Sequence, residues 1–77
     1  MEQRIFEMGL SVPATSLYLL LVSLSDGGAP LTRDNARSIW NGTPGEMDQA
    51  FAELVVRRIA GADPDATWFL RPAAEWQ

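Results

Sequence analysis

The tetrapeptide Thr43-Pro44-Gly45-Glu46 constrains the fold of this chain more than any other feature. A threonine followed three residues later by a glutamate is a capping box, and proline suits the first turn of a helix. We therefore predict a helix that begins here and continues to about Arg58. Its apolar residues recur at helical spacing and make a core face of Met47, Ala50, Phe51 and Leu54.

Two earlier helices are predicted from their start and stop signals. The first begins near Ser11, a good N-cap residue, and ends at about Leu24, before the breaker Asp26-Gly27-Gly28. One face of this helix carries Leu17, Leu20, Leu21 and Leu24. The second helix is capped by Thr32, covers about Arg33 to Trp40, and is closed by the turn Asn41-Gly42.

The last third of the chain changes from helical to β-type patterning. Residues 67–70 are β-branched, aromatic and aliphatic, which is typical of a strand. Asp63-Pro64-Asp65 is a turn signal, and residues 59–62 are the expected antiparallel partner. Gly61 is expected to close the third helix or to begin the link after it. The predicted fold class is mainly α: three helices followed by a small C-terminal β-hairpin.

A chain of 77 residues without cysteine makes one domain that depends on its hydrophobic core for stability. The composition, 47% apolar, is that of a globular protein. We expect residues 1–10 to pack on the core through Ile5, Phe6 and Met8. Trp40 and Trp68 are expected in the core, whereas Trp76 either folds back or takes part in a contact.

The order of elements resembles the winged helix-turn-helix superfamily over about Ser11 to Pro72. In that family a Leu-Thr pair opens the second helix, as Leu31-Thr32 does here, and the terminal hairpin is the wing. Inside the second and third helices the matching residues are Ala36, Ile39, Thr43, Met47, Ala50, Phe51 and Leu54. The resemblance implies a winged-helix fold, which serves both DNA binding and protein interaction.

Histidine, cysteine and lysine are all absent from the sequence. These residues supply most acid–base, nucleophilic and metal chemistry in proteins, so we expect a non-enzymatic domain without cofactor, metal or small-molecule substrate. Three carboxylates on the third helix could form an acidic cluster, but a solvated helix face is the simpler interpretation. These residues are Glu46, Asp48 and Glu53.

The net charge of −4 disfavours nucleic acid as a partner, because phosphate neutralisation supplies most of the affinity of DNA-binding proteins. The apolar run Leu17–Val22 is too short to cross a membrane. The N-terminus carries Glu2 and Glu7 instead of the basic region of a signal peptide. We therefore expect a cytoplasmic protein of bacterial type.

The best functional lead is a second apolar face on the first helix. Tyr18, Leu19 and Val22 lie away from the leucine face and are covered either by residues 5–10 or by another chain. The first hypothesis is a regulatory module that binds a protein partner, or a second copy of itself, through this face and the acidic face of the third helix. The acidic face carries Glu46, Gln49 and Glu53.

The alternative hypothesis is a winged-helix transcription regulator that binds DNA. Gln49 would then read adenine, because its side-chain amide can pair with that base through two hydrogen bonds. The phosphate contacts would come from arginines, namely Arg33, Arg37, Arg57, Arg58 and Arg71. A third hypothesis is an accessory subunit of an enzyme whose chemistry lies on the partner.

Overall fold

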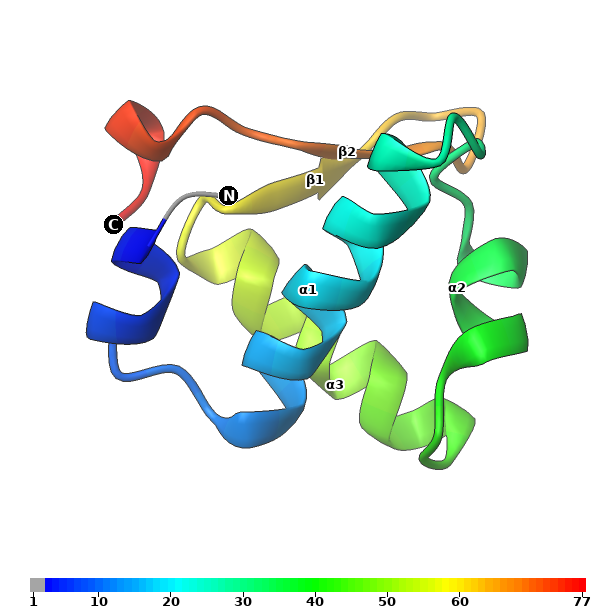
Figure 1. Ribbon diagram of the computed structural model, residues 1–77, viewed down its shortest axis with the longest axis horizontal. Helices are drawn as coiled ribbons and strands as arrows, with labels where there is room; N and C mark the ends of the chain where they lie inside the picture. The colour runs from blue at the N-terminus through cyan, green and yellow to red at the C-terminus, as the bar shows by residue number, and fades with distance from the viewer. Residues whose placement is uncertain (1–2) are drawn as a thin grey trace.

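The computed structural model describes residues 3–77, which form three α-helices and a two-stranded antiparallel hairpin (Figure 1). This confirms the mainly α fold class. Short 3-10 turns stand near each end of the chain. In chain order the elements are η1 (Gln3–Glu7), α1 (Val12–Asp26), α2 (Arg33–Ile39), α3 (Pro44–Val56), β1 (Ala60–Ala62), β2 (Trp68–Leu70) and η2 (Ala73–Glu75).

Each of the three α-helices begins at the residue that the sequence predicts. The Ser11 hydroxyl accepts from the main-chain N–H of Ala14, and the Thr32 hydroxyl accepts from that of Asn35. At Thr43 the capping box is complete in both directions, with Glu46 as its second member. Because these bonds satisfy N–H groups that have no partner within the helix, they set where each helix starts.

α3 ends at Val56, close to the predicted Arg58, but one of the two roles predicted for Gly61 is wrong. Gly61 does not close this helix, because Arg58 adopts the left-handed conformation (φ 57°) just after its last turn. Gly61 lies in β1 opposite Phe69 of β2. A Cβ atom on Gly61 would come within 2.4 Å of the Phe69 ring, so a larger residue here would displace the aromatic ring that covers the glycine.

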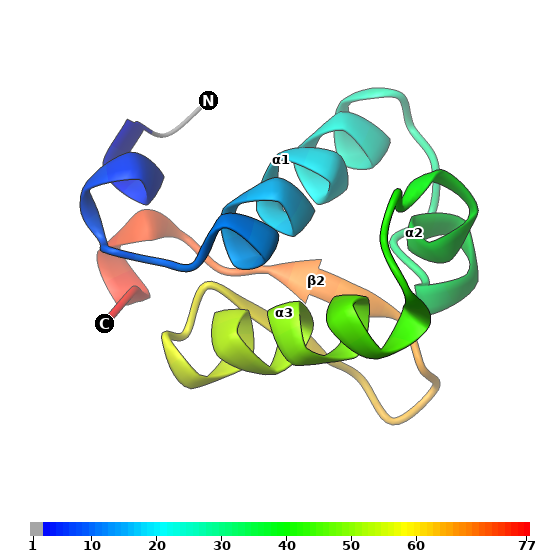
Figure 2. The ribbon, with the colours of Figure 1, turned by 90° about the horizontal axis from the view of Figure 1, so that it is seen from below.

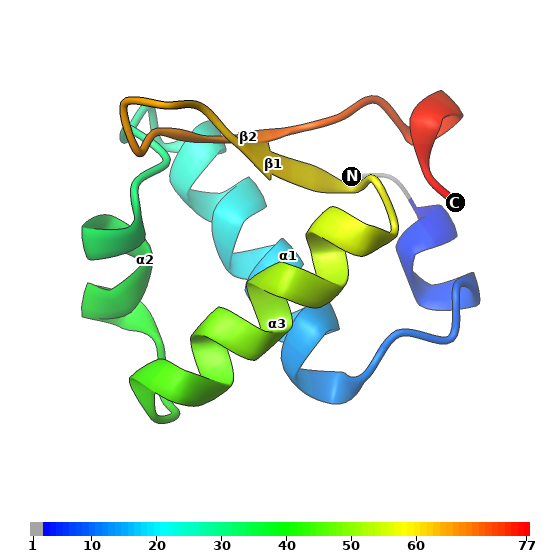
Figure 3. The same ribbon diagram turned by 180° about the vertical axis from the view of Figure 1, so that it is seen from behind.

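The hairpin is joined to the start of α2. Thr32 forms an isolated bridge with Thr67, and the N–H of Trp68 donates to the Leu31 carbonyl at 2.7 Å. The predicted Leu-Thr pair thus lies against β2, and Figure 3 shows the hairpin running across α1 and α3. This arrangement is compatible with a winged-helix-like layout.

The core lies between α1 and α3, which cross in the view of Figure 1 and lie one above the other in Figure 2, with α2 at one end. The predicted helix faces meet there: Leu17 and Leu21 are fully buried from α1, as are Met47 and Leu54 from α3. On the hairpin side the Phe51 ring stacks on Trp68, with 3.9 Å between ring centroids.

The two ends of the described chain are bound to each other at the end of the molecule opposite α2 (Figures 1 and 3). The Arg4 guanidinium donates to the Ala73 carbonyl at 3.1 Å, and that of Arg57 donates to the Met8 carbonyl at 3.0 Å and to the main-chain oxygen of Gln77. Of the three side chains predicted to pack on the core, Ile5 is buried and Met8 is half-buried against it, but Phe6 is 57% exposed. Residues 1 and 2 of the predicted segment lie outside the described part of the chain.

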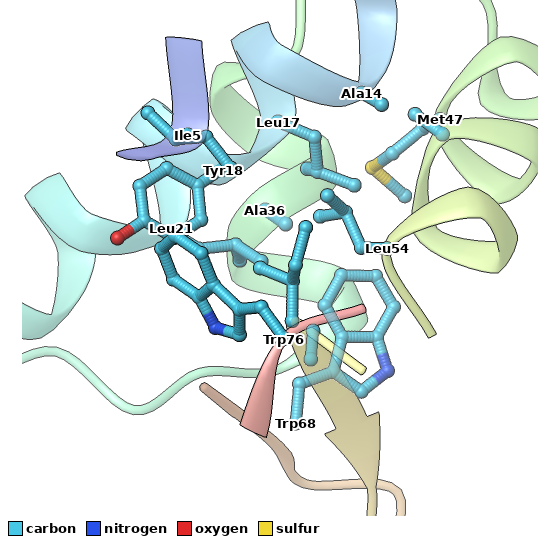
Figure 4. Close-up of a cluster of buried hydrophobic side chains, with 13 residues drawn as sticks. Ile5, Ala14, Leu17, Tyr18, Leu21, Ala36, Met47, Leu54, Trp68 and Trp76 are labelled. Atoms are coloured by element: carbon cyan, nitrogen blue, oxygen red, sulfur yellow. The ribbon is translucent and has the colours of Figure 1, made fainter. Parts of the chain in front are cut away.

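Trp76 folds back into the core, which is the first of the two alternatives predicted for it; the second was a role in a contact. Its side chain is 5% exposed, its ring meets Tyr18 edge-on at 5.6 Å, and its indole N–H donates to the Arg71 carbonyl. Figure 4 shows Tyr18 between Trp76 and Ile5. The residues that cover α1 on this side therefore come from both ends of the chain.

Candidate interaction surface

A groove runs between the N-terminal half of α1 and the start of α3. It consists of two adjoining hollows of about 420 and 330 Å³, which share Pro13 and Glu46 in their walls. The larger hollow is bordered by apolar groups of α1 and by the turn between α2 and α3. Its remaining lining residues are Val12, Ser16, Leu20, Trp40, Asn41 and Gly42.

Gly42, in the turn between α2 and α3, is one of the residues that line the larger hollow. The half-buried indole of Trp40 lies against this residue, and its N–H donates to the Thr43 carbonyl at 3.1 Å. A Cβ atom on Gly42 would lie 2.8 Å from the indole nitrogen of Trp40 and 3.4 Å from Oε2 of Glu46. Trp40, which was expected in the core, is half-buried and packs against the core from its edge, where it also borders this hollow.

The smaller hollow contains all three residues predicted for the acidic face of the third helix. Glu46, Gln49 and Glu53 line it together with Ser11 and the shared Pro13. The structure therefore places the predicted acidic face of the third helix next to the start of α1. Gln49 is exposed, and its side chain makes no hydrogen bond with another part of residues 3–77.

Glu53 is held by the start of α1. Its Oε2 accepts from the main-chain N–H of Ser11 at 2.8 Å, and its Oε1 accepts from the Ser11 hydroxyl at 2.8 Å. Both carboxylate oxygens thus stabilise the N-terminus of α1, where a negative charge is favoured by the helix dipole. The role of Glu53 within the folded domain is to cap α1.

Asp48 is bound to Arg33 of α2. The guanidinium donates two hydrogen bonds to the carboxylate, at 3.0 and 2.8 Å, in the two-pronged geometry that arginine and carboxylate favour. These hydrogen bonds and the charge of Arg33 lower the pKa of Asp48, and the nearby positive charge of Arg37 lowers it further. The same carboxylate raises the pKa of Arg33. This pair holds α2 against α3.

The apolar face on α1 was predicted to be covered by residues 5–10 or by another chain; at Tyr18 the cover comes from the chain itself, so the partner-binding role assigned to Tyr18 is wrong. Tyr18 is buried against Trp76, so it cannot lie on an open surface with Leu19 and Val22. Leu19 and Val22 are half-buried and pack against the core. Tyr18 is buried because the C-terminal tail covers this side of α1. A sequence pattern within one helix does not show where a distant tail will pack.

Most of the arginines proposed for DNA contacts have intramolecular partners. Arg33 is paired with Asp48, Arg57 binds main-chain oxygens at both ends of the described chain, and Arg71 lies 3.4 Å from Glu75 and over the Phe69 ring. Arg37 and Arg58 are exposed. These arginines therefore do not gather on one face as a set of unpaired cations.

The outer surface of α3 is acidic at its start and apolar at its end. No residue from Pro44 to Val56 is basic. Val55 and Val56 are exposed near the C-terminal end of the helix, Val56 to 75%. A helix that enters a DNA groove normally presents cationic or neutral polar groups to the phosphates, and α3 does not.

The features that sequence reasoning missed are those of the turn between α2 and α3. Val12, Trp40 and Gly42 border the larger hollow, and none was predicted as a site residue. Val12 is an aliphatic residue in a first helical turn, and nothing in the sequence marks it as exposed, although it is 79% exposed in the fold. Only the folded chain shows that it faces the turn.

Residues 3–77 contain no cluster of three or more carboxylate, histidine or cysteine side chains placed to hold a metal ion. Within the same residues, no helix has both the length and the apolarity required to cross a lipid bilayer. Comparisons with protein-family models, with curated proteins and with solved structures find no match to this chain.

Proposed function

We propose that this domain is a non-enzymatic regulatory module that binds a partner protein through the groove between α1 and α3. The observation that carries the proposal is the character of α3. This helix has no basic residue, and its Glu46, Gln49 and Glu53 line a groove whose other wall is the apolar start of α1. A surface that joins apolar area to negative charge suits a protein partner better than it suits a polyanion.

The hairpin favours the alternative of a DNA-binding regulator, because three helices followed by a hairpin resemble the winged helix-turn-helix superfamily. Against that alternative stand the net charge of −4 and the intramolecular partners of Arg33, Arg57 and Arg71. DNA binding at physiological salt needs several phosphate contacts, and these arginines would first have to leave their present partners.

The test compares capture of a partner by three forms of the domain. Val12→Glu places a charge in the larger hollow, whereas Ser23→Glu places the same charge on an exposed site of α1 outside both hollows. Protein captured from an extract of the source organism is identified, purified and titrated against each form. We expect the wild type and Ser23→Glu to bind alike and Val12→Glu to bind much more weakly.

Equal binding by Val12→Glu and Ser23→Glu would refute the groove as the site. Binding of random duplex DNA by the wild type at micromolar concentration, with a steep dependence on salt, would favour the DNA alternative instead. Sedimentation of the purified domain reports separately whether the partner is a second copy of the chain.

A further inference from the structure

Glu46 uses only one of its two carboxylate oxygens inside the domain. Oε1 accepts from the main-chain N–H of Thr43 at 3.3 Å and from the Thr43 hydroxyl at 3.0 Å, which completes the capping box. Oε2 has no hydrogen-bond partner among residues 3–77, and it faces Gly42. The carboxylate is therefore fixed in place while one oxygen stays available in the wall of the larger hollow.

The indole of Trp40 borders the same space. Its nitrogen and Oε2 of Glu46 both come within 3.4 Å of the point that a Cβ atom on Gly42 would occupy. The aliphatic side chains of Val12 and Leu20 from α1 line the same hollow. An aromatic ring, an available carboxylate oxygen and an aliphatic rim thus converge on one site.

We propose that this hollow binds a cationic side chain, arginine or lysine, carried by an apolar segment of the partner protein. The cation donates to Oε2 of Glu46, beside the Trp40 indole that lines the same hollow. Its methylene stem packs on Val12 and Leu20, as the stems of long cationic side chains do on apolar surfaces. This inference rests on the proposed function, because it names the chemistry of the segment that the groove would bind.

The balance of charge in the groove favours a cation over an anion. The N-termini of α1 and α3 both reach the groove, and each contributes the equivalent of roughly half a positive charge. Glu46 and Glu53 each contribute a full negative charge, so together they outweigh the two partial positive charges of the helix N-termini. No basic residue lines either hollow, so nothing in their walls would hold an anion or repel a cation.

The test measures binding of three capped synthetic peptides that are identical except at one residue type. The first combines leucine with arginine, the second replaces each arginine with glutamine, and the third replaces it with glutamate. Binding is followed by amide and indole signals in two-dimensional ¹H–¹⁵N NMR of the labelled domain. The Trp40 indole signal is assigned from Trp40→Phe. We expect the arginine peptide to shift this signal and the Glu46 amide, and to bind more tightly than the other two.

Two variants separate the role of Glu46 from that of net charge. Glu46→Gln keeps the capping box, because glutamine serves at this position, but removes the charge of the carboxylate. Asp26→Asn removes the same charge from the end of α1, outside both hollows. We expect the first to weaken binding of the arginine peptide by about two- to fivefold, the range for an exposed ion pair, and the second to leave it unchanged.

Each outcome decides the proposal. Equal affinity for the arginine and glutamine peptides, or equal affinity of the Glu46→Gln and Asp26→Asn variants, would overturn the cation site while leaving the groove as a protein-binding surface. If none of the peptides shifts the Trp40 signal, the cation site also falls. In that case the comparison of Val12→Glu with Ser23→Glu still decides whether a partner protein uses the groove.

Discussion

Replacement of Trp76 by alanine tests whether the folded-back tail is part of the core. Burial of a tryptophan side chain removes about 150–250 Å² from water, which at about 25 cal/mol per Å² corresponds to about 4–6 kcal/mol. Truncations of this kind cost about 3–5 kcal/mol in measured cores. Because Trp76 lies in a tail that can relax after truncation, we expect the lower end, about 3 kcal/mol.

That loss is large for a domain of this size. At about 0.05–0.15 kcal/mol per residue, a chain of 77 residues has a stability of about 4–12 kcal/mol. Trp76→Ala should therefore lower the midpoint of urea unfolding markedly and the Tm by about 12–24 °C. The measurement is urea and thermal unfolding followed by circular dichroism, with the slope of the urea transition compared between variants.

Trp76→Phe is the matched control. It keeps an aromatic ring beside Tyr18 but removes the indole N–H that donates to the Arg71 carbonyl, and we expect it to cost about 1–2 kcal/mol. A loss below about 1 kcal/mol for Trp76→Ala would refute the reasoning. It would show that Tyr18 is not held under the tail and that the predicted apolar face on α1 is open.

Three further substitutions test other parts of the structure. Leu19→Glu should destabilise the domain by about 1–2 kcal/mol in urea unfolding, because Leu19 packs against the core, and unchanged stability would show that it is solvated. Arg58→Gly should raise the unfolding free energy by about 1 kcal/mol, since glycine adopts the left-handed conformation without steric cost; a lower value would contradict the assigned conformation. Arg33 lowers the pKa of Asp48, so the stability from this pair is present at neutral pH and is lost as the pH falls through that lowered value. Carboxyl NMR should find the Asp48 midpoint below its usual range, and Arg33→Gln should raise it, while Arg37 still lowers it; equal midpoints in the two forms would refute the pairing.

The secondary structure could be predicted because its signals are local. The caps at Ser11, Thr32 and Thr43 each act within one turn of helix, and the structure confirms all three. Gly61 misled the prediction because glycine has two uses that look alike in a sequence. It can end a helix through its backbone freedom, or it can make room for a neighbouring side chain, here the ring of Phe69 across the hairpin.

The tertiary contacts were not predictable in the same way. Glu53 caps a helix that begins 42 residues earlier, and no spacing within α3 distinguishes that role from a solvated surface. The course of the chain after β2 decides what covers Tyr18, because it brings Trp76 back onto α1. The sequence therefore predicted which residues are apolar or charged, but the fold decides which of them remain available to a partner.

The three carboxylates of α3 show how strongly the fold limits that availability. Asp48 is paired with a guanidinium, and both oxygens of Glu53 are bound by Ser11, so neither can serve a partner without loosening the domain. Glu46 is bound through one oxygen, which orients the other toward the hollow beside Trp40. A group that is already oriented loses little freedom on binding, which favours affinity. Two of the three carboxylates of α3 are thus engaged inside the domain, and the proposed cation site uses the one carboxylate oxygen that the fold orients without binding it.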